Sequence, residues 1–157
     1  MKTWEIWLSH ISTVAVTVSG FAYLWMKYAI ENSDPFSVVN HPWQSAMLNL
    51  HVLAAPVLVF VTGMIAHSHM QKKLQSRVRT NRTTGIFSMA ALPIMIITGY
   101  ALQVVTGALV AEVVLVLHIG SSSIFAVTYM VHLVNSLREK RPATLAANRT
   151  FSRRQTA

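Results

Sequence analysis

Four histidines stand inside long apolar stretches of the sequence, where an ionisable side chain is costly: His10, His51, His118 and His132. Ionisable groups within a membrane are rare and usually mark a functional site. Neutral imidazole is a common ligand of haem iron. The chain has no cysteine, which excludes disulfides, cysteine-ligated iron–sulfur clusters and thioether-attached haem. Any redox group must therefore be held by histidine or methionine, or belong to a partner.

The stretches that carry these histidines are long enough to cross a membrane. Four intervals contain no Asp, Glu, Lys or Arg: 6–26, 44–71, 83–111 and 113–137. Each exceeds the ~20 residues with which a helix crosses a hydrocarbon core. Only 11% of the chain is charged, against about 25% in soluble domains. We predict an all-α, integral membrane four-helix bundle over 1–137, with helices at about 4–28, 45–69, 84–106 and 109–136.

The basic residues predict how this bundle is oriented. Twelve of the 13 Lys and Arg residues lie on one side, at Lys2, in the 72–82 loop and in a tail over 138–157, and only Lys27 lies on the other. The positive-inside rule then places both termini in the cytoplasm of a multi-pass protein of the bacterial inner membrane. We expect the tail to be basic and flexible. This face would meet anionic membrane lipids, so the high pI requires no nucleic acid.

The four histidines lie at two matched depths in this arrangement. His51 and His118 lie in the outer half, about six and nine residues below the outer helix ends. His132 follows His118 by fourteen residues, which puts both on one helical face about 21 Å apart. His10 lies near the inner helix end, at the depth of His132. We predict an outer haem b held by His51 and His118 and an inner haem b held by His10 and His132.

The inner site has a second candidate ligand in His69. It lies eighteen residues after His51 and shares its face in a straight helix, although Pro56 between them weakens that relation. His69 could replace His10 as the partner of His132, or contribute to a quinone site. A ligand on the second helix at the fourteen-residue spacing would fall at position 65, which is isoleucine.

Other features have both a functional and a structural interpretation. His41, before Pro42, lies in an outer loop that either covers the edge of the outer haem and docks an electron partner or is an ordinary interfacial cap. His67 is interpreted as an interfacial histidine. Three pairs of a hydroxyl residue with glycine allow close approach of a porphyrin or of a neighbouring helix, and helix packing alone explains them: Ser19-Gly20, Thr62-Gly63 and Thr98-Gly99.

With this arrangement the chain resembles the four-helix dihaem cytochrome b subunits of respiratory formate dehydrogenases and nickel–iron hydrogenases. In that family helix one supplies a ligand near the cytoplasm, helix two supplies one near the periplasm, and helix four supplies two spaced by fourteen. His10, His51, His118 and His132 match these places. The resemblance covers 4–136 and rests on spacing and depth, not on a long motif.

The resemblance implies an electron-transfer subunit that acts within an oxidoreductase complex of a respiratory chain. Electrons would pass between quinone and a periplasmic or membrane-bound redox protein, such as a c-type cytochrome or an iron–sulfur subunit. Two other classes stay open. A haem-free scaffold that anchors a larger complex predicts no cofactor. A histidine-lined transporter predicts acidic residues inside the spans, and the four charge-free intervals hold none.

Overall fold

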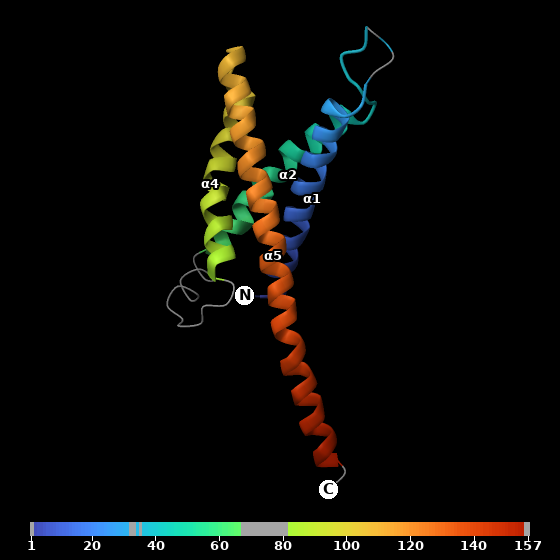
Figure 1. Ribbon diagram of the computed structural model, residues 1–157, viewed down its shortest axis with the longest axis vertical. Coiled ribbons are helices and arrows are strands. Elements are labelled where there is room, and N and C mark those ends of the chain that lie inside the picture. The colour runs from blue at the N-terminus through green and yellow to red at the C-terminus, as the bar shows by residue number, and fades with distance from the viewer. Residues whose placement is uncertain (1, 32–33, 35, 67–81, 156–157) are drawn as a thin grey trace. The chain divides into compact units, whose positions relative to one another are not determined.

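The computed structural model describes residues 2–31, 34, 36–66 and 82–155, with side chains omitted at Arg82 and from 139 onward. Its helices are α1 (Thr3–Tyr28), α2 (Gln44–Ile65), α4 (Arg82–Val104) and α5 (Ala108–Gln155), and the described residues contain no strand (Figure 1). All four helices are long and apolar enough to cross a membrane, α4 from Thr83 and α5 as far as Arg138. The prediction of four apolar helices of spanning length is confirmed.

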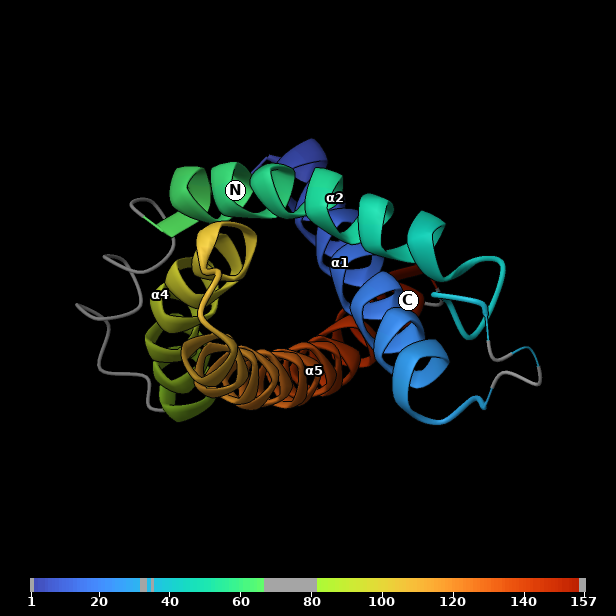
Figure 2. The ribbon, with the colours of Figure 1, turned by 90° about the horizontal axis from the view of Figure 1, so that it is seen from above.

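The chain divides into two units, Met1–Ser76 and Arg77–Ala157, and each is a pair of packed helices. In the first unit α1 packs against α2, and in the second α4 packs against α5; Figure 2 shows both pairs from above. The α4–α5 connection is the tight turn that the sequence predicts. Val105 ends α4 with a hydrogen bond to the Ala101 carbonyl, and the Gly107 carbonyl accepts the Ala111 amide, both at 2.9 Å.

Unlike a soluble protein, the described residues expose many large apolar side chains and bury small polar ones beside apolar ones. Large apolar residues such as Leu53, Phe60, Ile97 and Val116 are exposed. Among the described residues, the buried polar side chains are almost all small: Ser12, Thr13, Ser19, Gln44, Ser88, Thr98 and Ser121. Helices surrounded by lipid pack through small residues, because apolar side chains gain nothing by leaving a hydrocarbon solvent. The pattern therefore agrees with membrane-spanning helices.

Helices α4 and α5 meet along a seam of alternating three- and four-residue steps. Its α4 members are Thr84, Ser88, Ala91, Met95 and Thr98, and its α5 members are His118, Ser121, Phe125, Thr128 and His132. Three polar contacts cross the seam in one antiparallel register: Thr84 to His132, Ser88 to Thr128 and Thr98 to His118. This is heptad spacing, which keeps a contact line on one face when two helices coil around each other.

The seam explains why the two histidines of α5 are fourteen residues apart. A straight helix of 3.6 residues per turn would leave His132 about 40° off the face of His118. The ~3.5-residue period of a heptad seam returns to the same face after four turns. Two heptads on α5 are matched by two heptads on α4, from Thr84 to Thr98. The register of this hairpin thus places each histidine opposite a threonine.

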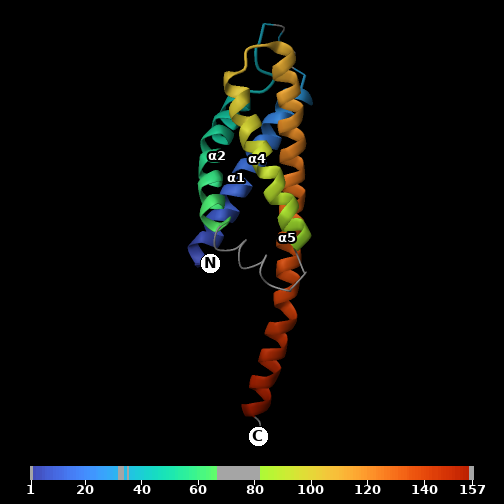
Figure 3. The same cartoon turned by 90° about the vertical axis from the view of Figure 1, so that its left-hand side faces the viewer.

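Helix α5 extends well beyond its contact with α4 (Figure 3). The sequence predicts a helix end near residue 136 and a flexible basic tail, whereas the structure continues the helix to Gln155. The residues of this extension include many Ala, Arg and Lys, which are favourable in helices. Pro142 also lies in this extension and is unfavourable inside a helix, so composition alone does not predict the continuation.

Candidate functional site

The imidazole of His118 on α5 is held by the backbone and a hydroxyl group of α4. Its Nδ1 lies 3.1 Å from the Met95 carbonyl oxygen and 3.1 Å from Thr98 Oγ1. The Thr98 hydroxyl donates its single proton to the Ile94 carbonyl at 2.7 Å, so its oxygen acts as an acceptor toward His118. Both neighbours of Nδ1 accept, and Nδ1 therefore carries the ring proton. The lone pair of the neutral imidazole is left on Nε2.

His51 on α2 is held in the same way by α1. Its Nδ1 lies 2.9 Å from the Val16 carbonyl oxygen. A carbonyl can only accept a hydrogen bond, so Nδ1 of His51 is again the protonated nitrogen and Nε2 carries the lone pair. The Ser19 hydroxyl donates to the carbonyls of Ala15, at 2.6 Å, and Val16, at 3.2 Å, as Thr98 does on α4.

A glycine opens each of these carbonyls to the imidazole. A Cβ added at Gly20 would lie 2.8 Å from His51 Cε1, and one at Gly99 would lie 3.0 Å from His118 Cε1. In a helix the carbonyl of residue i points toward residue i+4, so a side chain at i+4 would cover it. Gly20 and Gly99 stand at that position relative to Val16 and Met95. We call this arrangement of a carbonyl, a hydroxyl three residues on and a glycine four residues on a histidine seat.

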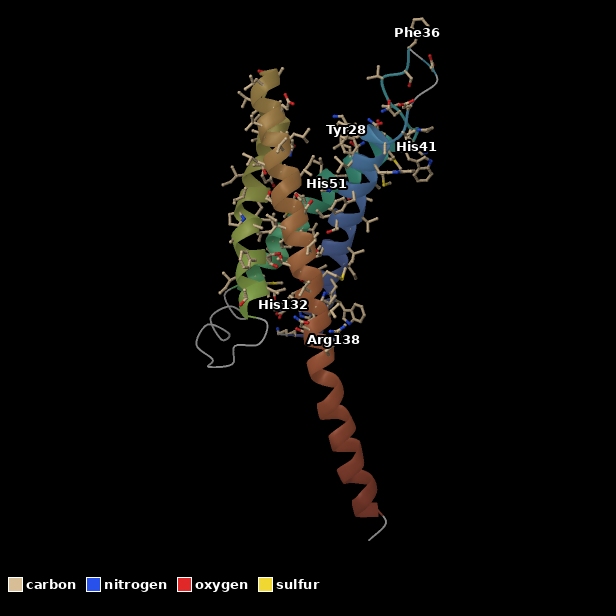
Figure 4. The ribbon with its side chains drawn as sticks, in the orientation of Figure 1. Tyr28, Phe36, His41, His51, His132 and Arg138 are labelled. Atoms are coloured by element: carbon tan, nitrogen blue, oxygen red, sulfur yellow. The ribbon has the colours of Figure 1, made fainter. Side chains whose placement is uncertain are left out.

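His132 occupies a related place lower on the same hairpin, at a third hydroxyl–glycine pair. Its Nδ1 lies 3.2 Å from Thr84 Oγ1, and a Cβ at Gly85 would lie 3.7 Å from its Cε1. Figure 4 shows His132 on α5 in the turns before Arg138, and His51 along α2. The clearance at Gly85 is ordinary van der Waals contact, so this seat is looser than the other two.

The sequence interpretation missed most of this pattern. It treated Ser19-Gly20 and Thr98-Gly99 as helix packing, and it did not single out Thr84-Gly85. The available signal was that Thr84-Gly85 and Thr98-Gly99 repeat at fourteen residues, as His118 and His132 do. Thr62-Gly63 has a different role, because nothing lies within 4 Å of a Cβ at Gly63.

The remaining histidines differ from these three. His10 is half-buried on α1, three residues before the buried Thr13. His41, labelled in Figure 4, accepts the Trp43 amide on its Nδ1 at 3.1 Å, in the turn that precedes α2. His67 and His69 lie outside the described residues, so the choice between His10 and His69 stays a prediction.

Two buried hydroxyls stand close to predicted ligands without a hydrogen-bond partner among the described residues. They are Oγ1 of Thr13, three residues after His10, and Oγ of Ser122, four residues after His118. Ser121, by contrast, donates to the Leu117 carbonyl at 2.7 Å. A group bound beside either histidine would have an unused hydroxyl within one helical turn.

The seats present single imidazoles, not clusters of ligands. Within the described part of the chain, no three or more His, Cys, Asp or Glu side chains come together to hold a metal ion. A haem iron needs only axial ligands from the protein. No family model, curated protein or solved structure matches this chain.

Proposed function

We propose that this chain is a dihaem b-type cytochrome of the bacterial inner membrane, with both termini in the cytoplasm. It would carry electrons between a periplasmic or membrane-bound redox protein and the quinone pool, as one subunit of a larger complex. The observation that supports this proposal most strongly is the repeated histidine seat, in which Nδ1 of an imidazole lies within hydrogen-bonding distance of a backbone carbonyl of the neighbouring helix.

The residues present fit haem as a ligand. Histidines that bind a metal usually donate the other ring proton to a carbonyl, which fixes the tautomer and raises the basicity of the ligating nitrogen. His51 and His118 make this hydrogen bond, to Val16 and Met95. The two seats have the same chemistry although they belong to different hairpins. Each is suited to ligate haem iron, and their matched depths in the sequence are the reason for proposing them as the two ligands of the outer haem.

For the inner haem we propose His132 with His10. On α2 the position two heptads after His51 is Ile65, so that helix offers no second ligand at the spacing found on α5. His69 is the alternative partner of His132, and if it is not a ligand it could serve a quinone near the inner haem. When bound, haem supplies the one-electron exchange between ferrous and ferric iron. The chain's own residues orient the imidazoles through the contacts to Nδ1.

The unused hydroxyls of Thr13 and Ser122 would complete the surroundings of the bound groups. Each is buried within one helical turn of a proposed ligand, His10 or His118. An unpaired buried hydroxyl costs free energy that a polar substituent or a bound water would recover. The basic residues of the cytoplasmic side would contact anionic lipid headgroups.

A haem-free scaffold is the second candidate, and the same hydrogen bonds support it. In that case the bonds of His51 to Val16 and of His118 to Met95 serve only to join helices. The two functions differ in what removal of a histidine does. Replacing a histidine that only packs changes the stability of the protein, whereas replacing a haem ligand also removes one bound haem.

The test is the haem content of purified single-histidine variants, measured as the pyridine haemochrome per chain. His118→Ala and His132→Ala should each lose about half of the bound haem, because each ligand belongs to a different haem. His41→Ala is the matched control, since His41 Nδ1 accepts a turn amide and is not among the proposed ligands, and this variant should keep both haems. Full haem content in the His118 and His132 variants would contradict the proposal.

A further inference from the structure

Contacts to the Nδ1 atoms of His51, His118 and His132 come from the backbone and hydroxyl groups of the helix packed against each. His51 faces a carbonyl, that of Val16, at 2.9 Å. His118 faces the carbonyl of Met95 and the hydroxyl of Thr98, both at 3.1 Å. His132 faces the hydroxyl of Thr84 at 3.2 Å. A threonine hydroxyl thus touches Nδ1 of one proposed ligand of each haem, that of Thr98 at His118 and that of Thr84 at His132.

The acceptor of an axial histidine affects the potential of its iron. A stronger acceptor draws the Nδ1 proton and gives the imidazole more anionic character, which favours ferric over ferrous iron and lowers the potential. Removing an acceptor has the opposite effect and raises the potential. The acceptor acts through the imidazole it touches, so its effect belongs to one haem.

We propose that Thr98 and Thr84 are positioning residues that set the potentials of the outer and inner haem separately, through His118 and His132. This inference rests on the proposed function. When Nε2 of His132 binds iron, Nδ1 carries the proton and the Thr84 oxygen accepts it. When Nε2 of His118 binds iron, the Thr98 oxygen shares the proton with the Met95 carbonyl.

The separation of the two effects follows from the spacing of the seam. Thr84 and Thr98 are two heptads apart on α4, about 21 Å along the helix, as are the histidines they contact. Between them the seam holds the hydrogen bond of Ser88 to Thr128, at 2.7 Å, in which no histidine takes part. Thr128 is thus a threonine on the same seam whose hydroxyl touches a serine, not an imidazole.

The experiment is a redox titration of the visible spectrum of the full-length protein, with the variants Thr84→Val, Thr98→Val and Thr128→Val. Valine keeps the shape of threonine and removes only the hydroxyl. Thr84→Val should shift the inner component to higher potential and leave the outer one in place. Thr98→Val should do the reverse, and Thr128→Val should move neither. Thr84→Ser, which restores a hydroxyl, should return the inner potential toward the original value.

The two components are assigned with the ligand variants, because the component that remains in His118→Ala is the inner haem. If Thr84→Val and Thr98→Val bind both haems and leave both potentials unchanged, the inference is wrong while the proposed function stands. The same holds if Thr128→Val moves the potentials as much as they do. A protein that binds no haem at all overturns the proposed function itself, and this inference with it.

Discussion

Replacing Gly20 by alanine should expel the His51 imidazole from its seat and weaken binding of the outer haem. The added Cβ would lie 2.8 Å from Cε1 and 2.9 Å from Nδ1 of His51, against about 3.5–4 Å for an ordinary carbon contact. Because the clash is with a rigid ring, the ring must move by roughly 1 Å. That movement stretches the 2.9 Å hydrogen bond to the Val16 carbonyl beyond hydrogen-bonding distance.

The size of the effect follows from three terms. Overpacking costs about 1–3 kcal/mol and the lost hydrogen bond about 1 kcal/mol, while alanine gains up to about 1 kcal/mol over glycine as a helix residue. The net loss of about 1–3 kcal/mol corresponds to a roughly 5- to 150-fold smaller equilibrium constant for holding the imidazole in its seat. The assay is the haem retained per chain after purification, together with the thermal midpoint of the protein.

The other glycines supply a graded control for this substitution. A Cβ at Gly99 would meet His118 at 3.0 Å, one at Gly85 would meet His132 only at 3.7 Å, and one at Gly63 would meet nothing within 4 Å. The loss of haem should therefore decrease from Gly20→Ala to Gly99→Ala and be absent in Gly85→Ala and Gly63→Ala. If Gly20→Ala retains as much haem as Gly63→Ala, the seat is not what positions the ligand.

Three more predictions concern the ligand pairs and the topology. His51→Ala should lose the same spectral component as His118→Ala if both ligate the outer haem as proposed; loss of different components would contradict that pairing. His10→Ala should lose the component that His132→Ala loses, and His69→Ala should keep it, measured as haem per chain; the reverse result would make His69 the inner ligand. Of two reporter enzymes fused to the C-terminus, the one that functions only in the cytoplasm should be active and the one that functions only in the periplasm should be inactive. The opposite result would show that the C-terminus lies in the periplasm.

The helices could be predicted from the sequence because a helix that crosses lipid needs about 20 consecutive residues without charged side chains. The charge-free intervals 44–71 and 83–111 contain α2 and most of α4, and the turn before Ala108 lies where expected. The extension of α5 to Gln155 could not be predicted in this way. Beyond Arg138 there is no apolar requirement, and residues that favour a helix also occur in flexible segments.

The histidines of the site could be found from the sequence, but their seats could not. That His118 meets Met95 and Thr98 depends on the register of two helices, which a single helix does not reveal. With 3.6 residues per turn, the fourteen-residue spacing indicates only a shared face. Because α4 and α5 both follow heptad spacing, two histidines fourteen residues apart make the same kind of contact twice. Thr84-Gly85 becomes recognisable only when it is placed opposite His132.

Whether the chain binds haem is decided by the dithionite-reduced minus oxidised visible spectrum of the purified protein, with haem quantified per chain. A dihaem b-type cytochrome should give its α-band and two haems for each chain. Absence of that band after expression with adequate haem would contradict the proposal, and the histidine seats would then be helix contacts alone.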